Sequence, residues 1–244
     1  MEIGSGRQPS LCVDSNGNLV LTYLEGGEVY VRTSSDRDNK LHFDEPISIS
    51  SLKGKSMQTM RRGPKIVSSG DALVVSAIMK TDDGNADLYV TRSIDHGTTW
   101  SESIRVNSVS NSAREGLHSM TSDGGNRIGI VWLDLRSEKT EVWCAISKDN
   151  GKTFGKDALV YRSPDGATCE CCKPEINFDA MGRVNVMFRN HLGEVRDIYV
   201  ATSDDGGETF NTVKKLGEGS FPASACPMDG GSLVRVGSKL VAVF

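Results

Sequence analysis

The feature of this sequence that most constrains its fold is a short motif that occurs three times in nearly constant register. The motif has the pattern Ser-x-Asp-x-Gly-x-Thr-aromatic, and its copies begin at Ser93, Ser147 and Ser203. These copies begin 54 and 56 residues apart, and a more divergent copy begins at Ser34. Because self-similarity at such a period marks a repeated structural unit, the sequence predicts one fold built from similar units.

The residues around the motif repeat as well. A short segment that pairs an aromatic residue with a β-branched residue or Cys precedes each copy, and a hairpin with polar turn residues comes earlier still. Each unit is therefore predicted to form four antiparallel strands, with the motif in the turn between the third and the fourth strand. Repeats of this size and content are typical of β-propeller blades. We predict an all-β propeller with four-stranded antiparallel blades at approximately residues 8–50, 64–105, 117–160 and 173–216, and an incomplete blade at 226–244.

The chemistry of the motif explains why it belongs in a turn. An Asp can accept hydrogen bonds from nearby backbone N–H groups, and Gly supplies a positive φ angle. The Ser or Thr hydroxyl can bond locally, and we expect the terminal aromatic residue to pack between blades. We therefore assign the repeated carboxylates to structure rather than to catalysis. The motif residues with this role are Ser93, Asp95, Gly97, Trp100, Ser147, Asp149, Gly151, Phe154, Ser203, Asp205, Gly207 and Phe210.

These residues carry a resemblance to a known family. The repeat resembles the Asp-box (BNR) repeat of sialidases (neuraminidases) and related β-propellers, and the resemblance covers essentially the whole chain. It implies six blades in a complete propeller, of which about four and a half would be present here. We therefore expect residues 1–244 to be a single sialidase-like propeller domain that is a fragment of a longer protein.

Charge and hydropathy narrow the classes of partner. The chain has a formal net charge of −4, which argues against a nucleic-acid binder that depends on a basic surface. The longest strongly apolar run, residues 72–79, is less than half a membrane span. The first six residues have neither a basic nor an apolar segment, so we expect no signal peptide in this chain. The resemblance implies a complete protein that is secreted, periplasmic or at the cell surface.

The functional rim of a propeller can be predicted from the order of its strands. The turn between strands one and two and the motif turn share one rim, whereas the remaining connections share the other. Loops on a rigid scaffold commonly carry function, so we place the functional site on the second rim. We interpret Arg61 and Lys173 there as solvated loop charges.

The sialidase resemblance implies particular roles on this rim. Sialidases clamp a substrate carboxylate with three arginines, use an Asp as acid/base and use a Tyr activated by a Glu as nucleophile. We assign candidate catalytic roles to Asp134, Arg62, Arg136 and Arg189, and candidate substrate-binding roles to Arg7, Glu115, His118 and Asn190. We expect Asp134, Arg136 and Arg189 to line or border the main pocket beside the central channel. No convincing Tyr/Glu pair can be assigned.

Three functions remain open at this point. The first is a sialidase-like, exo-acting glycoside hydrolase that acts on sialylated or related acidic glycans. The second is a non-catalytic propeller that binds glycans or proteins, and the third is a metal-binding propeller. The expected ligand is a glycan or another small acidic molecule, and no cofactor is required.

Four of the six cysteines occupy equivalent positions on neighbouring blades. Cys169, Cys171 and Cys172 come just before the fourth blade, and Cys226 comes just before the fifth. We predict a disulfide from Cys171 or Cys172 to Cys226, which implies an oxidising compartment. A thiolate site for zinc or copper(I) is the alternative, with His118 as a further ligand. Cys12 and Cys144 fall within predicted strands, where we expect them to be buried.

Overall fold

The computed structural model describes residues 5–37, 40–59, 61–164, 166–222, 224 and 228–244. These residues form twenty β-strands, and no helix occurs among them. No helical segment in these ranges could therefore cross a membrane.

The strands form five sheets that follow one another along the chain. Every strand pair in them is antiparallel. The first sheet contains β1 (Arg7–Val13), β2 (Leu19–Glu25), β3 (Glu28–Arg37), β4 (Lys40–Phe43) and β5 (Ile47–Ser48). The second contains β6 (Lys55–Ser56), β7 (Lys65–Ser69), β8 (Ala72–Lys80), β9 (Ala86–Ser93) and β10 (Ile104–Arg105).

The remaining sheets repeat this order with fewer strands. The third sheet is β11 (His118–Ser122), β12 (Ile128–Ser137), β13 (Lys139–Ser147) and β14 (Ala158–Tyr161). The fourth is β15 (Glu175–Phe178), β16 (Val184–Leu192), β17 (Val195–Ser203) and β18 (Thr212–Lys215). The fifth is the hairpin of β19 (Ser232–Val236) and β20 (Lys239–Val243).

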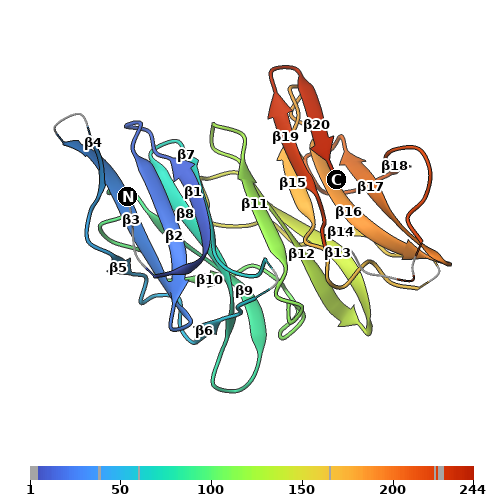
Figure 1. Cartoon of the computed structure of the whole chain (residues 1–244), viewed down its shortest axis with the longest axis horizontal. Helices are drawn as coiled ribbons and strands as arrows, with labels where there is room; N and C mark the ends of the chain where they lie inside the picture. The colour runs from blue at the N-terminus through green and yellow to red at the C-terminus, as the bar shows by residue number, and fades with distance from the viewer. Residues whose placement is uncertain (1–4, 38–39, 60, 165, 223, 225–227) are drawn as a thin grey trace.

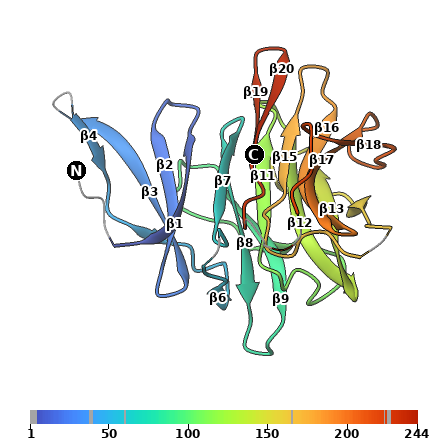
Figure 2. The same ribbon diagram turned by 45° about the vertical axis from the view of Figure 1, so that its right-hand side comes forward.

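The first long strands of successive sheets lie side by side. Strand β1 contacts β7, β7 contacts β11, β11 contacts β15, and β15 contacts β19. The sheets fan out from this row, from the blue first sheet to the red hairpin (Figures 1 and 2). This arrangement of four-stranded antiparallel sheets confirms the predicted propeller architecture.

The apolar core lies between neighbouring sheets. Strand β8 is buried along nearly its whole length because its two faces contribute to different clusters. The motif aromatics fill the same spaces. Trp100 packs with the cluster between the first and second sheets, Phe154 with the next cluster, and Phe210 with the cluster between the third and fourth sheets. The predicted packing of these side chains between blades is therefore what the structure shows.

The motif turns have the same hydrogen bonds in each copy. Asp95 accepts from Ser93 Oγ at 2.7 Å, from Thr99 N at 2.9 Å and from Thr99 Oγ1 at 2.5 Å. Partial burial of the Asp95 carboxylate opposes ionisation, but the hydrogen bonds from Thr99 and Ser93 outweigh it and lower its pKa to about 2. The carboxylate therefore holds the turn closed.

The motif turns lie on the same rim as the turns between the first two long strands of each sheet, such as the β1–β2 turn. Asn16 in the β1–β2 turn contacts the ring of His96 in the next motif, and Ser69 Oγ donates to Asn150 Oδ1 at 3.1 Å. Each motif therefore joins its sheet to the preceding one. This leaves the opposite rim for a ligand.

Candidate functional site

A central pocket opens where the first strands of four sheets begin. Its volume is about 570 Å³, within the range of small-molecule sites. It lies on the rim opposite the motif turns, because every lining segment is the start of an inner strand or the loop just before one. The lining residues are Gln8, Pro9, Ser10, Arg61, Arg62, Lys65, Lys173, Glu175, Gly231 and Ser232.

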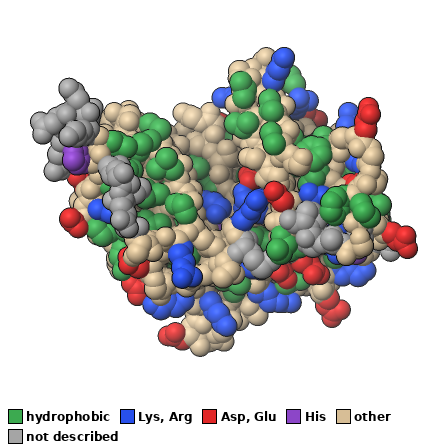
Figure 3. Space-filling view, in the orientation of Figure 1, with side chains coloured by type: hydrophobic (Ala, Val, Ile, Leu, Met, Phe, Trp, Pro, Cys, Tyr) green, Lys and Arg blue, Asp and Glu red, His purple; other side chains and the backbone are tan. Residues whose placement is uncertain are grey.

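The lining of the central pocket is mainly cationic. It contains four basic side chains and one acidic one, and Figure 3 shows blue side chains near the centre of this face. Two of the cations are neutralised, because Lys173 pairs with Glu175, and Arg61 Nη1 lies 2.7 Å from Asp229 Oδ1. The other two are Arg62 and Lys65.

Arg62 and Lys65 bond to backbone carbonyls. Arg62 Nε donates to the carbonyl of Glu115 at 2.6 Å, and Lys65 Nζ donates to that of Gly63 at 3.3 Å. Burial lowers the pKa of Lys65 to about 8, and the charge of Lys173 adds to this effect. The pocket therefore carries positive charge that an anionic ligand could neutralise.

Arg62, which was predicted to lie on this rim, lines the pocket, and its catalytic role stays a prediction. Arg61 and Lys173, interpreted as solvated loop charges, line the pocket, and Lys65 was not singled out. A usable signal was present, because Arg62 lies two residues before Pro64 and Lys173 lies directly before Pro174, and each proline immediately precedes an inner strand.

The expectation that Asp134 and Arg136 line the central pocket is wrong. Asp134 is fully buried and accepts hydrogen bonds from Ser112 Oγ at 2.7 Å and from Trp132 Nε1 at 2.8 Å. Arg136 also binds Asp134, at 2.9 Å, and its guanidinium lies 3.6 Å from the ring centroid of Trp143. These groups form an internal network that ties β12 to β13, because a buried carboxylate is costly unless hydrogen-bond donors and an ion-pair partner satisfy it.

Arg189 also lies away from the central pocket. It borders a separate pocket and donates to the carbonyls of Asp229 at 3.0 Å and Arg196 at 2.7 Å. It therefore fixes the segment before β19, and it does not form a three-arginine clamp with Arg62 and Arg136. Asn190 is fully buried and donates to Tyr161 Oη at 3.1 Å.

The remaining predicted binding residues lie around the pocket rather than in its lining. His118 is buried, and its Nε2 lies 3.0 Å from Ser76 Oγ. Burial lowers the pKa of His118 well below its usual value, with Lys65 and Lys173 adding repulsion, so the ring is neutral. Glu115 is half-buried, and burial raises its pKa, with a further contribution from Glu170. Arg7 is exposed on β1.

Three cysteines lie beside the central pocket in the β14–β15 loop. Cys169 and Cys172 are buried and are not in a disulfide, whereas Cys171 is disulfide-bonded. Cys226 lies outside the described residues, so its predicted bond to Cys171 or Cys172 stays a prediction. Cys144 is a buried free thiol and Cys12 is partly buried and free.

Comparisons with solved structures show the fold. A Hadza microbial sialidase is 19% identical, with a TM-score of 0.56, and the match covers 87% of this chain and 46% of that one. An endo-arabinase from Bacteroides thetaiotaomicron is 14% identical, with a TM-score of 0.56, and the match covers 98% and 89%. An ulvan lyase of a polysaccharide lyase family is 14% identical, with a TM-score of 0.55, and the match covers 85% and 55%.

These likenesses concern architecture, because all three identities are below 20%. The chain spans about half the length of the sialidase that it matches. A search of curated protein sequences found no match. The BNR repeat-like domain family, however, matches residues 25–236, which is most of the sequence. The repeated motif, the four-stranded sheets and this match together show that the chain belongs to the BNR repeat-like domain family.

Proposed function

We propose that this chain is part of a carbohydrate-active propeller that binds an acidic sugar in its central pocket. The observation that carries the proposal is the pair Arg62 and Lys65, whose side chains line the pocket and donate to backbone carbonyls. The other two basic side chains of the lining, Arg61 and Lys173, are already paired with carboxylates. A guanidinium and an ammonium group together suit a carboxylate or a sulfate group.

The names of the similar structures support a carbohydrate ligand. They are a sialidase, an endo-arabinase and an ulvan lyase, and the lyase structure was solved with a bound GlcA–Rha3S ligand. That ligand is acidic, as is the sialic acid that gives sialidases their name. The cationic pocket of this chain fits the same chemistry.

The described lining favours binding over hydrolysis. Glycoside hydrolysis usually needs two carboxyl groups, or a carboxyl group with a Tyr/Glu pair in sialidases. Among the described residues that line the pocket, Glu175 is the only one with a carboxylate, and it is ion-paired with Lys173. Sialidase-like hydrolysis therefore stays a separate prediction, to be tested on the complete protein with a fluorogenic sialoside.

Isothermal titration with free sugars tests the binding proposal. We expect N-acetylneuraminic acid or glucuronic acid to bind and neutral arabinose not to bind. Arg62→Ala should weaken acid-sugar binding at least tenfold, because a hydrogen bond to a charged group contributes about 1.5–3 kcal/mol. Lys152→Ala is the matched control, since Lys152 is exposed on the opposite rim. Equal binding of acidic and neutral sugars, or an unchanged Arg62→Ala variant, would contradict the proposal.

An extracytoplasmic location is consistent with this function. Cys171 is disulfide-bonded, and structural disulfides persist in oxidising compartments. Fractionation of cells that express the complete protein tests this inference. Recovery of the protein only from the cytoplasm would contradict it.

A further inference from the structure

A second pocket, here named the aromatic pocket, opens on the same rim as the central pocket. Its volume is about 370 Å³, which is within the range of small-molecule sites. Its walls come from the end of β16, the start of β17, the loop that follows β18 and the residue after β20. Because the motif turn of this sheet lies at the other end of β17, the aromatic pocket belongs to the rim that we assign to function.

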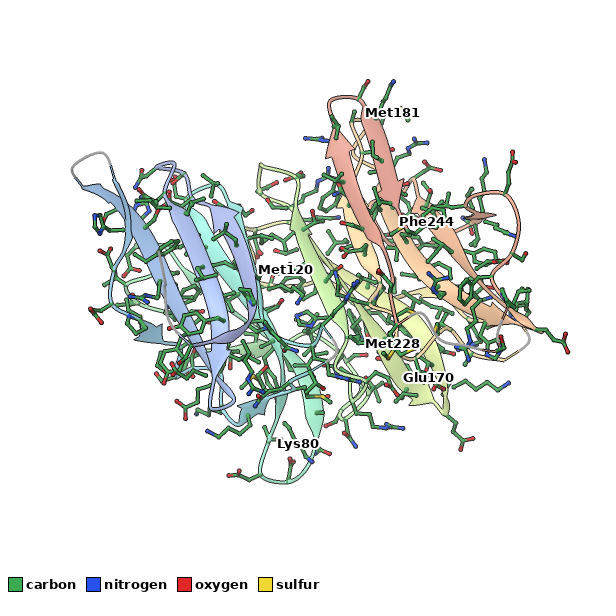
Figure 4. All side chains as sticks on the ribbon, in the orientation of Figure 1. Lys80, Met120, Glu170, Met181, Met228 and Phe244 are labelled. Atoms are coloured by element: carbon green, nitrogen blue, oxygen red, sulfur yellow. The ribbon has the colours of Figure 1, made fainter. Side chains whose placement is uncertain are left out.

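Two exposed aromatic side chains distinguish the aromatic pocket. Phe221 is 40% exposed and Phe244 is 57% exposed, and both line the pocket. Figure 4 labels Phe244, which directly follows β20. Exposed apolar side chains that gather around a hollow are typical of a ligand-binding groove.

The backbone of Phe221 is fixed even though its ring is exposed. Its N–H donates to Asp197 Oδ1 at 2.9 Å, and its carbonyl accepts from the N–H of Arg196 at 2.8 Å. Asp197 is itself buried, accepts from Ser220 Oγ at 2.9 Å and pairs with Lys215 at 2.9 Å. The loop therefore presents the Phe221 ring from a fixed position, which lowers the entropic cost of binding a ligand.

The charges of the aromatic pocket are closer to balance than those of the central pocket. Arg189 is the one basic residue among its described lining residues, and its guanidinium donates to two backbone carbonyls. Asp197 and Glu218 supply carboxylates, and that of Asp197 is paired with Lys215. This lining suits a neutral sugar, because the C–H groups on one side of a sugar ring pack on an aromatic face while its hydroxyls donate to a carboxylate.

One residue connects the walls of the two pockets. The carboxylate of Asp229 pairs with Arg61 Nη1 at 2.7 Å, and Arg61 lines the central pocket. The carbonyl of Asp229 accepts from Arg189 Nη2 at 3.0 Å, and Arg189 lines the aromatic pocket. Gly231, which also lines the central pocket, donates its N–H to Asp229 Oδ1 at 2.8 Å. The two pockets are therefore neighbours on the rim, separated by the short segment around Asp229.

We propose that the aromatic pocket binds a neutral sugar that is joined to the acidic sugar in the central pocket. This inference rests on the proposed function of the central pocket. It extends the ligand from a single sugar to an oligosaccharide in which a neutral residue follows an acidic one. Arg189 has a positioning role in this arrangement, because its bonds to Asp229 hold the wall between the two pockets.

Isothermal titration with matched pairs of ligands tests the proposal. The pairs are N-acetylneuraminic acid and its conjugate with lactose, and glucuronic acid and its conjugate with xylose. Each conjugate is thio-linked, so that a hydrolase does not cleave it during the measurement. We expect a conjugate to bind about fivefold more tightly than its free acidic sugar, which is the scale of one aromatic contact.

Substitution of Phe221 separates the two pockets. Phe221→Ala should remove the advantage of the conjugate and leave the affinity for the free acidic sugar unchanged, because this ring is not part of the central pocket. Phe221→Tyr keeps an aromatic face and should retain the advantage. Met181→Ala is the matched control, since Met181 is 71% exposed in the turn between β15 and β16, on the opposite rim and apart from Phe244 in Figure 4.

The outcomes distinguish this inference from the proposed function. A free acidic sugar that binds as tightly as its conjugate would overturn the inference and leave the proposed function standing. A conjugate whose advantage survives in Phe221→Ala, or is lost equally in Met181→Ala, would also overturn the inference. Failure of every acidic sugar and every conjugate to bind would overturn both.

Discussion

Replacement of Asp149 by Ala tests whether the repeated carboxylates hold the fold together. Asp149 lies in the motif turn that follows β13, where its carboxylate accepts from Ser147 Oγ at 2.8 Å, from Thr153 N at 2.9 Å and from Thr153 Oγ1 at 2.6 Å. The turn carries Phe154 into the cluster between the second and third sheets. The Asp149→Ala variant loses all three bonds and loosens this packing.

The expected cost is about 2 kcal/mol of unfolding free energy. Each bond to a charged acceptor contributes about 1.5–3 kcal/mol when buried. Asp149 is only partly buried and Thr153 is exposed, so water replaces part of what is lost. For a chain of this size, 2 kcal/mol corresponds to a fall in Tm of about 4–8 °C.

Thermal unfolding followed by circular dichroism measures the effect. Asp204→Ala is the matched control, because Asp204 belongs to another motif copy but its side chain is 73% exposed and 3.8 Å from Arg183. Such a surface pair contributes about 0–1 kcal/mol. Sugar affinity should be unchanged in both variants. An Asp149→Ala variant that melts like the wild type but no longer binds sugar would show that the two rims have been assigned the wrong way round.

The dependence of the unfolding free energy on acidic pH gives a second test of the role of Asp149. Partial burial of Asp149 opposes ionisation, but hydrogen bonds from Thr153 and Ser147 outweigh it, and the net pKa is lowered. A lowered folded-state pKa stabilises the protein above the unfolded value of about 3.9, and this contribution disappears as the pH falls through the folded-state pKa. The difference in stability between wild type and Asp149→Ala should therefore shrink below about pH 4.

Three further outcomes are expected. Asp134→Asn should lower the unfolding free energy by about 2–3 kcal/mol, because Arg136 loses a buried charged partner, while acid-sugar affinity measured by titration stays the same. Gly151→Ala should lower Tm, because Gly151 has a φ of +76° and a Cβ would lie 2.9 Å from Val74 Cγ2; an unchanged Tm would contradict this. The affinity for an acidic sugar should fall between pH 7 and 9 as Lys65 loses its proton, and Lys65→Met should remove this pH dependence.

The sequence was sufficient to predict the repeat and its architecture. The motif recurs because each copy closes the same turn with local hydrogen bonds, such as those that Asp95 accepts from residues within four positions along the chain. Local interactions of this kind are visible in sequence. The alternation of strands and the placement of the motif aromatics between sheets follow from the same periodicity.

The composition of the central pocket was decided by the tertiary structure. Asp134 and Arg136 directly follow a predicted inner strand and resemble a catalytic pair in the sequence. In the structure, however, their side chains form an ion pair with each other inside the third sheet. Arg61, in contrast, was interpreted from the sequence as a solvated loop charge. It lines the pocket and pairs with Asp229, which is 168 positions away in the chain. Whether a charge is neutralised internally or left for a ligand depends on which distant segments the inner strands bring together. That information lies in the packing of the sheets and not in any one repeat.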